Sequence, residues 1–474
     1  MKLSLEQIAG FTAARGAFDA AAIASGYSID SRTIAPGQLF FAVRGERLDG
    51  HDFVLPALQR GAVGAVVSED QASRFADRSR LLLVQNPLLA LQALATGVRT
   101  LWGGPLVAVT GSAGKTTTKE MIAALLGARY RVLKSEGNLN NHFGLPLQLL
   151  RLEPEHEVAV VELGMSHHGE ITALARLARP TLGVVTNVGP VHLGFFRSVA
   201  EIARAKKELI DALDPSAVAV LNADDEYVSQ FGRNFPGRVV TFGLHNPADV
   251  RGERLQDLGL QGVRFDLVVA HETFGATLPL LGVHNVANAL AAVAVAVNRG
   301  LAPEVAAAEL AHFRAVERRG QVVEIAGATV INDCYNSNPK ALESMVDALA
   351  GMRPAPGGRR IVVAGEMLEL GPAGEELHRR AGQHLAARGI DVLAGVRGVA
   401  AFLVEGARQP LEGATPGSGP QTEFFETVEQ AGAWLAQAVR PGDLVLLKAS
   451  RGVHLERALE IWQAQTQPAG LGQR

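Results

Sequence analysis

Short apolar runs alternate with helix-like patterns along most of the chain, and they fall into three successive groups. In the first group, the apolar runs 38–43 and 61–67 are bounded by turn residues and predict buried strands. A helix is predicted between them, over residues 55–60. Residues 1–100 are therefore expected to form a small α/β domain.

The second group begins near Pro105, where the runs become continuously apolar. Such runs are typical of parallel strands that are buried on both faces. The strands are predicted at 106–109, 158–161, 182–185 and 218–221. Helices are predicted at 116–126 and 285–298. The alternation predicts a doubly wound, mostly parallel sheet for residues 101–314.

The third group repeats the alternation on a smaller scale. Its strands are predicted at 329–331, 361–364, 392–395 and 444–448. Its helices are predicted at 340–349, 375–387 and 428–439. Residues 315–474 are therefore expected to form a separate Rossmann-like domain. Exposed loops rich in Pro and Gly are predicted at 353–358 and 409–421, and a frayed tail is predicted after Thr466. The predicted fold class is α/β, with three domains.

Composition narrows the functional classes. Of 474 residues, 47% are hydrophobic and 20% are charged, which is typical of a globular protein with a large core. The formal net charge of −3 and the lack of a basic run argue against nucleic-acid binding. Cys334 is the only cysteine, so no internal disulfide can form, and a cytoplasmic location is expected. No apolar run reaches the ~20 residues that a membrane helix needs, and no signal peptide is expected.

A glycine-rich loop follows the predicted strand 106–109 and opens a helix, which is the context in which such loops bind phosphate. Gly111 and Gly114 allow the backbone N–H groups to converge on an anion, and the helix N-terminus adds partial positive charge. Lys115 can reach the outer phosphates, and the Thr116 hydroxyl can ligate Mg²⁺. The commoner motif has glycine where Val109 stands. The residues predicted to hold phosphate are Gly111, Ser112, Ala113, Gly114, Lys115, Thr116 and Thr117.

A carboxylate ends the next predicted buried strand. Glu162 follows the apolar run 158–161, beside the predicted nucleotide crevice. A hard oxygen ligand at this place suits Mg²⁺. The alternative is a strand-end carboxylate in solvent.

The loop Gly111–Thr117 resembles the ATP loop of the Mur ligase superfamily, which comprises the cell-wall amide ligases and folylpolyglutamate synthase. The resemblance extends over nearly the whole chain, with further motifs in the expected order. It implies ATP and Mg²⁺, with two ions, as cofactors. It also implies metal ligands at Glu162, at His192 in the segment 187–193, and at Lys206 in the segment 205–208. In the family, a lysine of that last segment reacts with CO₂ to give a carbamate; we assign it to Lys206 and not to Lys207. The implied metal ligands are Thr116, Glu162, His192 and Lys206, and the implied catalytic residues are Lys115, Lys206, His192 and Glu162.

The segment 282–292 resembles the His-Asn-x-x-Asn signature of the family. Asn285 and Asn288 lie one helical turn apart and are candidates for recognising adenine, because an amide can both donate and accept. Asn285 could also cap the helix. The resemblance further implies an arginine that contacts the ATP phosphates, for which Arg319 fits the pattern better than Arg318.

The segment 332–339 resembles the signature of the superfamily branch that adds D-alanyl-D-alanine, with Cys334 in place of a small residue. Cys334 is expected to be packed and not nucleophilic. The implied nucleotide-sugar contact is Asp333, and the implied junction residues are Tyr335 and Asn336. Further substrate contacts are implied at Asn138 and Asn141, at Ser31 and Arg32, and at Ser450 and Arg451. His142 stands where relatives have an acid, and its role is open.

The reaction implied by the resemblance joins D-alanyl-D-alanine to UDP-N-acetylmuramoyl-tripeptide through an acyl phosphate, in peptidoglycan precursor synthesis. The third domain is expected to close onto the second, and the enzyme is expected to be a monomer. One alternative is a sibling ligase, either MurE or folylpolyglutamate synthase, against which the run 335–339 argues. Others are a P-loop NTPase switch or motor and a non-catalytic nucleotide-binding module. The third residue of the tripeptide is not specified by the sequence.

Overall fold

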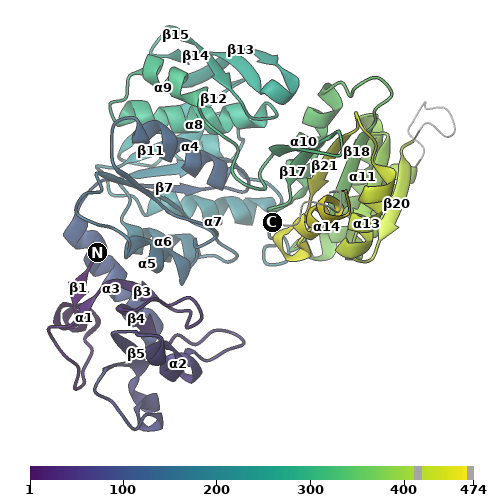
Figure 1. Cartoon of the computed structure of the whole chain (residues 1–474). Coiled ribbons are helices and arrows are strands. Elements are labelled where there is room, and N and C mark those ends of the chain that lie inside the picture. The colour runs from purple at the N-terminus through teal and green to yellow at the C-terminus, as the bar shows by residue number, and fades with distance from the viewer. Residues whose placement is uncertain (410–418, 467–474) are drawn as a thin grey trace, which may run out of the picture.

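Three separate sheet systems follow one another along the chain (Figure 1). The computed structural model describes residues 1–409 and 419–466. The N-terminal sheets lie at one end of the large central sheet, and the C-terminal sheet lies at its side. This arrangement confirms the predicted α/β class with three domains. The exact domain boundaries stay a prediction.

The N-terminal part holds a parallel four-stranded sheet and a small antiparallel pair. The strands are β1 (Leu3–Ser4), β2 (Ile23–Ala24), β3 (Gly26–Ser28), β4 (Gln38–Phe41), β5 (Gly64–Ser68) and β6 (Leu81–Val84), and the helices are α1 (Leu5–Thr12), α2 (Val54–Gln59) and α3 (Pro87–Trp102). The predicted strands 38–43 and 61–67 are confirmed as β4 and β5. Helix α3 was not predicted, and it runs across residue 100. Asn86 caps its start by accepting from the N–H groups of Leu88 and Leu89.

The central sheet has nine strands in the order β15-β14-β13-β12-β11-β10-β7-β9-β8. They are β7 (Leu106–Thr110), β8 (Val132–Lys134), β9 (Val158–Glu162), β10 (Leu182–Val185), β11 (Val218–Asn222), β12 (Arg238–Gly243), β13 (Val250–Asp257), β14 (Val263–Val269) and β15 (Glu272–Leu278). The four predicted parallel strands are confirmed as β7, β9, β10 and β11. The antiparallel extension β13–β15 was missed.

Helices cover both faces of the parallel part of this sheet. They are α4 (Lys115–Gly127), α5 (Gly144–Leu149), α6 (Glu170–Ala178), α7 (Val199–Asp211), α8 (His284–Asn298) and α9 (Pro303–Leu310). Strand β7 shows why its sequence is continuously apolar: Leu106 and Ala108 pack in the core with α3, α5, α6 and α7, whereas Val107 and Val109 pack in the core with α4, α8 and α9. The predicted double winding is confirmed.

The C-terminal sheet has six strands in the order β16-β17-β21-β18-β19-β20. They are β16 (Gln321–Ile325), β17 (Ala328–Asp333), β18 (Arg360–Gly365), β19 (Val392–Val396), β20 (Gln421–Phe425) and β21 (Leu444–Lys448), with helices α10 (Pro339–Gly351), α11 (Gly374–Ala387), α12 (Ala401–Arg408), α13 (Val428–Ala438) and α14 (Glu456–Thr466). The four predicted strands and three predicted helices are confirmed. Most of the predicted loop 409–421 and the tail after Thr466 lie outside the described residues.

Because β17, β18 and β21 are parallel, the loops that follow them leave the sheet at one edge. These loops meet the glycine-rich loop and the loop after β10. Among the described residues, no helix has both the length and the hydropathy needed to cross a bilayer.

Candidate active site

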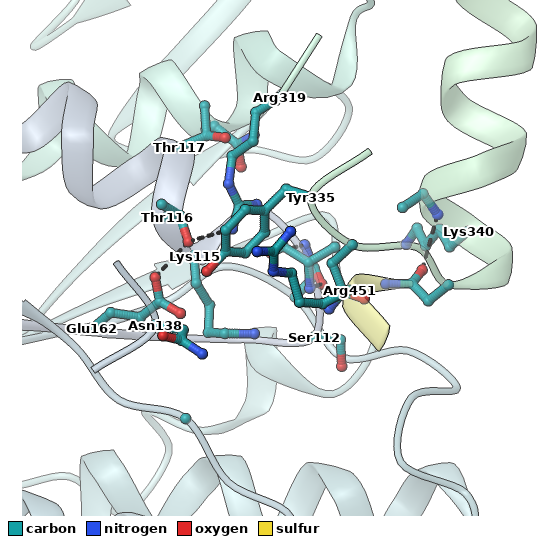
Figure 2. Close-up of a pocket in the computed structure, with 18 of the residues that line it drawn as sticks. Ser112, Lys115, Thr116, Thr117, Asn138, Glu162, Arg319, Tyr335, Lys340 and Arg451 are labelled. Atoms are coloured by element: carbon teal, nitrogen blue, oxygen red, sulfur yellow. Dashed lines mark hydrogen bonds between the residues drawn. The ribbon is translucent and has the colours of Figure 1, made fainter. Parts of the chain in front are cut away.

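A cavity of about 460 Å³ lies between the central sheet and the C-terminal domain. Figure 2 shows Thr116 between Glu162 and Arg319, with Tyr335 and Arg451 beside them. The cavity brings together most of the residues singled out in the sequence. Those that line it are Ser112, Ala113, Gly114, Lys115, Thr116, Thr117, Asn138, Asn141, Glu162, His192, Lys206, Asn285, Asn288, Arg319, Asp333, Tyr335, Asn336 and Arg451.

The glycine-rich loop turns sharply between β7 and α4. Gly114 has a φ of +79° and Gly111 a φ of +150°, which side-chain-bearing residues rarely adopt. A Cβ on Gly114 would overlap the side-chain oxygen of Asn288, and a Cβ on Gly111 would overlap the hydroxyl of Thr186. Helix α4 begins at Lys115, so its N-terminus faces the cavity and favours an anion there.

Replacing Gly114 with alanine is expected to lower the free energy of unfolding by about 2 kcal/mol, because the positive φ is strained and the Asn288 amide must move. The matched control is Gly127→Ala at the other end of α4, where nothing lies within 4 Å of the added methyl. That change should be neutral or stabilising by up to about 1 kcal/mol. Urea denaturation of both variants checks this; equal stabilities would contradict the account of the loop.

Glu162 is the centre of a hydrogen-bonded cluster beside the loop. Its Oε2 accepts from Thr116 Oγ1 at 2.6 Å, and its Oε1 accepts from Asn140 Nδ2 at 2.8 Å. Thr116 Oγ1 in turn accepts from Arg319 Nη2 at 2.9 Å. Lys115 Nζ donates to Gly111 O at 2.9 Å. The hard oxygen donors Thr116 and Glu162 are thus adjacent, which suits a divalent cation. The positive charge around them suits the phosphates that would be bound with it.

Lys206 lies on α7 with its side chain almost fully buried against this cluster. Burial lowers the pKa of Lys206 well below its usual value; Lys115 lowers the pKa further, and Glu162 opposes the change. Burial also lowers the pKa of Lys115, with Glu162 opposing and Arg319 reinforcing it. The neighbouring Lys207 instead forms an ion pair with Asp211 on the outside of the helix. Of the two lysines, Lys206 is therefore the one that faces the cavity.

His192 follows β10 and reaches across to the C-terminal domain. Its Nδ1 lies 2.5 Å from Glu369 Oε2, and this hydrogen bond is the largest cause that holds the pKa of Glu369 below its usual range. Among the described residues, no group of three His, Cys, Asp or Glu side chains forms a ready metal site.

The side chains at the start of α8 bind protein atoms in this structure. Asn288 Nδ2 donates to Asn285 Oδ1 at 3.0 Å, and Asn288 Oδ1 accepts from Thr118 at 3.3 Å. Asn285 Nδ2 donates to Leu281 O at 2.8 Å. Helix α8 begins at His284, before Asn285, and no side chain caps it, so the alternative role of Asn285 as helix cap is wrong. Burial lowers the pKa of His284, which also lines the cavity, to about 4.

Two arginines of the C-terminal domain have different partners. Arg319 stacks on the Tyr335 ring at 4.1 Å and reaches Thr116, whereas Arg318 pairs with Glu456 at 2.8 Å. Arg319 is therefore the arginine that enters the cavity. Arg451 also pairs with Glu456, at 2.5 Å, and lies 5.9 Å from the Tyr335 ring centre.

Asp333 and Cys334, at the end of β17, both form contacts with residues of β21 in their own domain. Asp333 Oδ2 accepts from Lys448 Nζ at 2.5 Å. The Cys334 thiol is buried and donates to Leu447 O at 3.6 Å, and burial raises its pKa. The expectation that Cys334 is packed is confirmed, because a buried thiol with a raised pKa is a poor nucleophile.

Three predicted substrate contacts lie outside the cavity lining. Arg32 forms an ion pair with Asp30 on the N-terminal domain, and 87% of the Arg32 side chain is exposed. Ser31 beside it is buried. Ser450 is buried and accepts from the N–H of Leu368 at 2.9 Å. The roles proposed for these three residues stay predictions.

Several cavity residues were missed in the sequence; they are Asn140, His284, Lys340, Glu369 and Lys448. His284 stands inside the recognised segment 282–292, Asn140 lies between the candidates Asn138 and Asn141, and Lys448 ends a predicted strand. No sequence pattern indicated which side chain of each motif would face the cavity, because that depends on contacts between distant segments.

Family models match three successive parts of the chain. They are described as "Mur ligase family, catalytic domain" over residues 24–99, "Mur ligase middle domain" over 109–296, and "Mur ligase, glutamate ligase domain" over 318–451.

Relatives and solved structures agree with these matches. A UDP-N-acetylmuramoyl-tripeptide--D-alanyl-D-alanine ligase from Bacillus subtilis is 36% identical over 442 residues, which cover 92% of each chain. The crystal structure of MurF from Acinetobacter baumannii has a TM-score of 0.88 at 29% identity, covering 98% of this chain and 99% of that one. MurF from Thermotoga maritima in complex with ADP has a TM-score of 0.80 at 28% identity, covering 94% and 98%. On its sequence, its fold and the contents of its cavity, this chain belongs to the Mur ligase family.

Proposed function

We propose that the chain is an ATP-dependent ligase that joins D-alanyl-D-alanine to UDP-N-acetylmuramoyl-tripeptide, in the cytoplasmic synthesis of peptidoglycan precursors. The observation that carries this proposal is the cavity in which a phosphate-binding loop, several lysine and arginine side chains and the C-terminal domain meet. The full-length relative from Bacillus subtilis carries the name of this activity, and MurF from Thermotoga maritima was solved with ADP.

ATP is proposed to place its outer phosphates at the N-terminus of α4. Lys115 turns from Gly111 O towards the γ-phosphate, and Arg319 closes over it from the C-terminal domain. Both Lys115 and Arg319 are half-buried, which strengthens their attraction for phosphate. Asn285 and Asn288 are proposed to contact adenine, and Asp333 the nucleotide sugar.

The residues proposed to hold two Mg²⁺ ions are Thr116, Glu162, His192 and Lys206. The ions would neutralise charge on the phosphates during transfer. Lys206 fits this role as a carbamate: a buried amine with a lowered pKa is neutral enough to react with CO₂, and the resulting anion would lie beside the Lys115 cation. The neutral amine adds CO₂ and releases one proton, so the uncharged side chain becomes an anion.

The proposed chemistry has two steps. A carboxylate oxygen of the tripeptide attacks the γ-phosphorus, the bond to the β-phosphate bridging oxygen breaks, and ADP leaves. The free amine of D-alanyl-D-alanine then attacks the acyl carbon, loses a proton, and expels inorganic phosphate. Positioning and charge stabilisation supply the acceleration, and no covalent bond to the enzyme is needed.

Substrate contacts are proposed on all three domains. Ser31 and Arg32 would bind the UDP-sugar end, and Asn138 and Asn141 the peptide. The other contacts are proposed at Tyr335, Asn336, Ser450 and Arg451. Arg451, which is fixed by Glu456, would pair with the free carboxylate of the dipeptide.

Phosphate release tests the proposal. With ATP, Mg²⁺ and UDP-N-acetylmuramoyl-tripeptide, D-alanyl-D-alanine is expected to raise the rate at least tenfold and to yield one pentapeptide for each phosphate. Release that is independent of the dipeptide would favour a P-loop NTPase. Nucleotide binding without any release would favour a non-catalytic module. A product formed only with a single amino acid as acceptor would favour a sibling ligase.

A further inference from the structure

We propose that Glu369 is a positioning residue, which reaches from the C-terminal domain to hold the ring of His192 when the two domains are docked. This inference rests on the proposed function, because His192 is proposed there as a metal ligand. It adds to that function a residue of the C-terminal domain that completes the metal site of the central domain.

The two residues lie on loops from different domains that touch closely. His192 follows β10 and Glu369 follows β18, and their side chains meet at 2.5 Å. The same loops share a backbone hydrogen bond, from Gly194 N to Glu369 O at 3.0 Å. A Cβ on Gly371 would lie only 2.8 Å from Gly194 Cα. The contact therefore joins backbones as well as side chains, and it exists only while the domains are docked.

The loop that carries Glu369 is fixed from within its own domain. His378 is fully buried, and its Nε2 accepts from Met367 N at 2.9 Å. Ser450 Oγ accepts from Leu368 N at 2.9 Å and donates to Ser337 O at 3.2 Å. The two residues before Glu369 are thus held by buried side chains, so the carboxylate is presented by a rigid segment.

The hydrogen bond determines what the other nitrogen of His192 can do. An ionised carboxylate only accepts hydrogen bonds, so Nδ1 is the nitrogen that donates to Glu369, and Nε2 is the nitrogen left to bind a cation. A carboxylate partner of this kind fixes the tautomer and the ring orientation of a metal-binding histidine. His192 lines the same cavity as Glu162 and Lys206, so a fixed ring would serve the proposed cation site.

The test compares Glu369→Ala and Glu369→Gln with the control Glu375→Ala, an exposed residue six positions further along the chain. Glutamine keeps an oxygen that can accept from Nδ1, whereas alanine removes it. The first measurement is Mn²⁺ affinity, by EPR titration of enzyme that holds a non-hydrolysable ATP analogue and UDP-N-acetylmuramoyl-tripeptide. The second is kcat and KM for D-alanyl-D-alanine.

For Glu369→Ala, Mn²⁺ affinity and kcat are each expected to fall about tenfold or more, while KM for the dipeptide changes less than twofold. Glu369→Gln should recover most of both losses. Glu369→Asp keeps the charge, but its shorter side chain moves the carboxylate away from His192 Nδ1. This variant should therefore also lose Mn²⁺ affinity and kcat. Mn²⁺ affinity in Glu369→Ala equal to that of the control, or a glutamine variant as damaged as the alanine variant, would overturn the inference. A wild-type enzyme that forms no amide would instead overturn the proposed function.

Discussion

Replacing Lys115 with alanine lowers the rate of amide formation by about a thousandfold or more. Lys115 lies at the N-terminus of α4, is half-buried, and has Gly111 O as its acceptor in this structure. It is proposed to neutralise the γ-phosphoryl group as charge shifts to its oxygens. In the alanine variant, the loop no longer supplies a cation next to the charged phosphoryl oxygens. The measurement is phosphate release and pentapeptide formation at saturating ATP, Mg²⁺ and both substrates.

The matched control for this change is Lys134→Ala. Lys134 is a half-exposed lysine of the same domain that pairs with Glu120 at 2.5 Å. Since exposed ion pairs contribute little, its loss should leave the rate within twofold of wild type. A Lys115→Ala enzyme that retains more than a tenth of the wild-type rate would contradict the assigned role of the loop.

Lys206→Ala is expected to lower the ligation rate by a similar factor of about a thousand, because the site loses a proposed anionic metal ligand. A small carboxylic acid added at high concentration should restore part of the rate, since it can occupy the space of the missing carbamate. The measurement is pentapeptide formation by the variant with increasing acetate or formate.

The neighbouring lysine gives a direct control. Lys207 belongs to the same helix turn but pairs with Asp211 on the outer face, so Lys207→Ala should keep nearly full activity and should not respond to added acid. Full activity of Lys206→Ala without added acid would exclude the carbamate. If only the Lys207 variant were inactive, the carbamate would belong to the lysine on the outer face of the helix, which would contradict the structure.

The sequence predicted the parallel cores well for a physical reason. Strands such as β7 and β9 are buried on both faces, so each reads as an unbroken apolar run that stands out from its surroundings. Strand β14 was missed because only unbroken apolar runs were taken as strands, and this strand alternates: Val263, Phe265 and Leu267 are buried, while Arg264 between them is exposed. Such alternation is typical of a strand with one exposed face, and β14 pairs with antiparallel partners on both sides.

The site was predictable where one local segment carries the chemistry. The glycine-rich loop is such a segment, because its turn, its lysine and its hydroxyls are consecutive. The contact between His192 and Glu369 joins residues 177 positions apart, and no local pattern could pair them. Likewise, the choice between Arg318 and Arg319 depends on Glu456, which holds the first and leaves the second free to reach Thr116.

The most direct test of the central claim follows one oxygen atom. UDP-N-acetylmuramoyl-tripeptide labelled with ¹⁸O in its reacting carboxylate is converted with ATP and D-alanyl-D-alanine, and the released phosphate is analysed by mass spectrometry or ³¹P NMR. If the carboxylate attacks the γ-phosphorus, one ¹⁸O atom leaves with each phosphate from fully labelled substrate. Phosphate that carries no label while the pentapeptide forms would show that the carboxylate was never phosphorylated, and it would contradict the account.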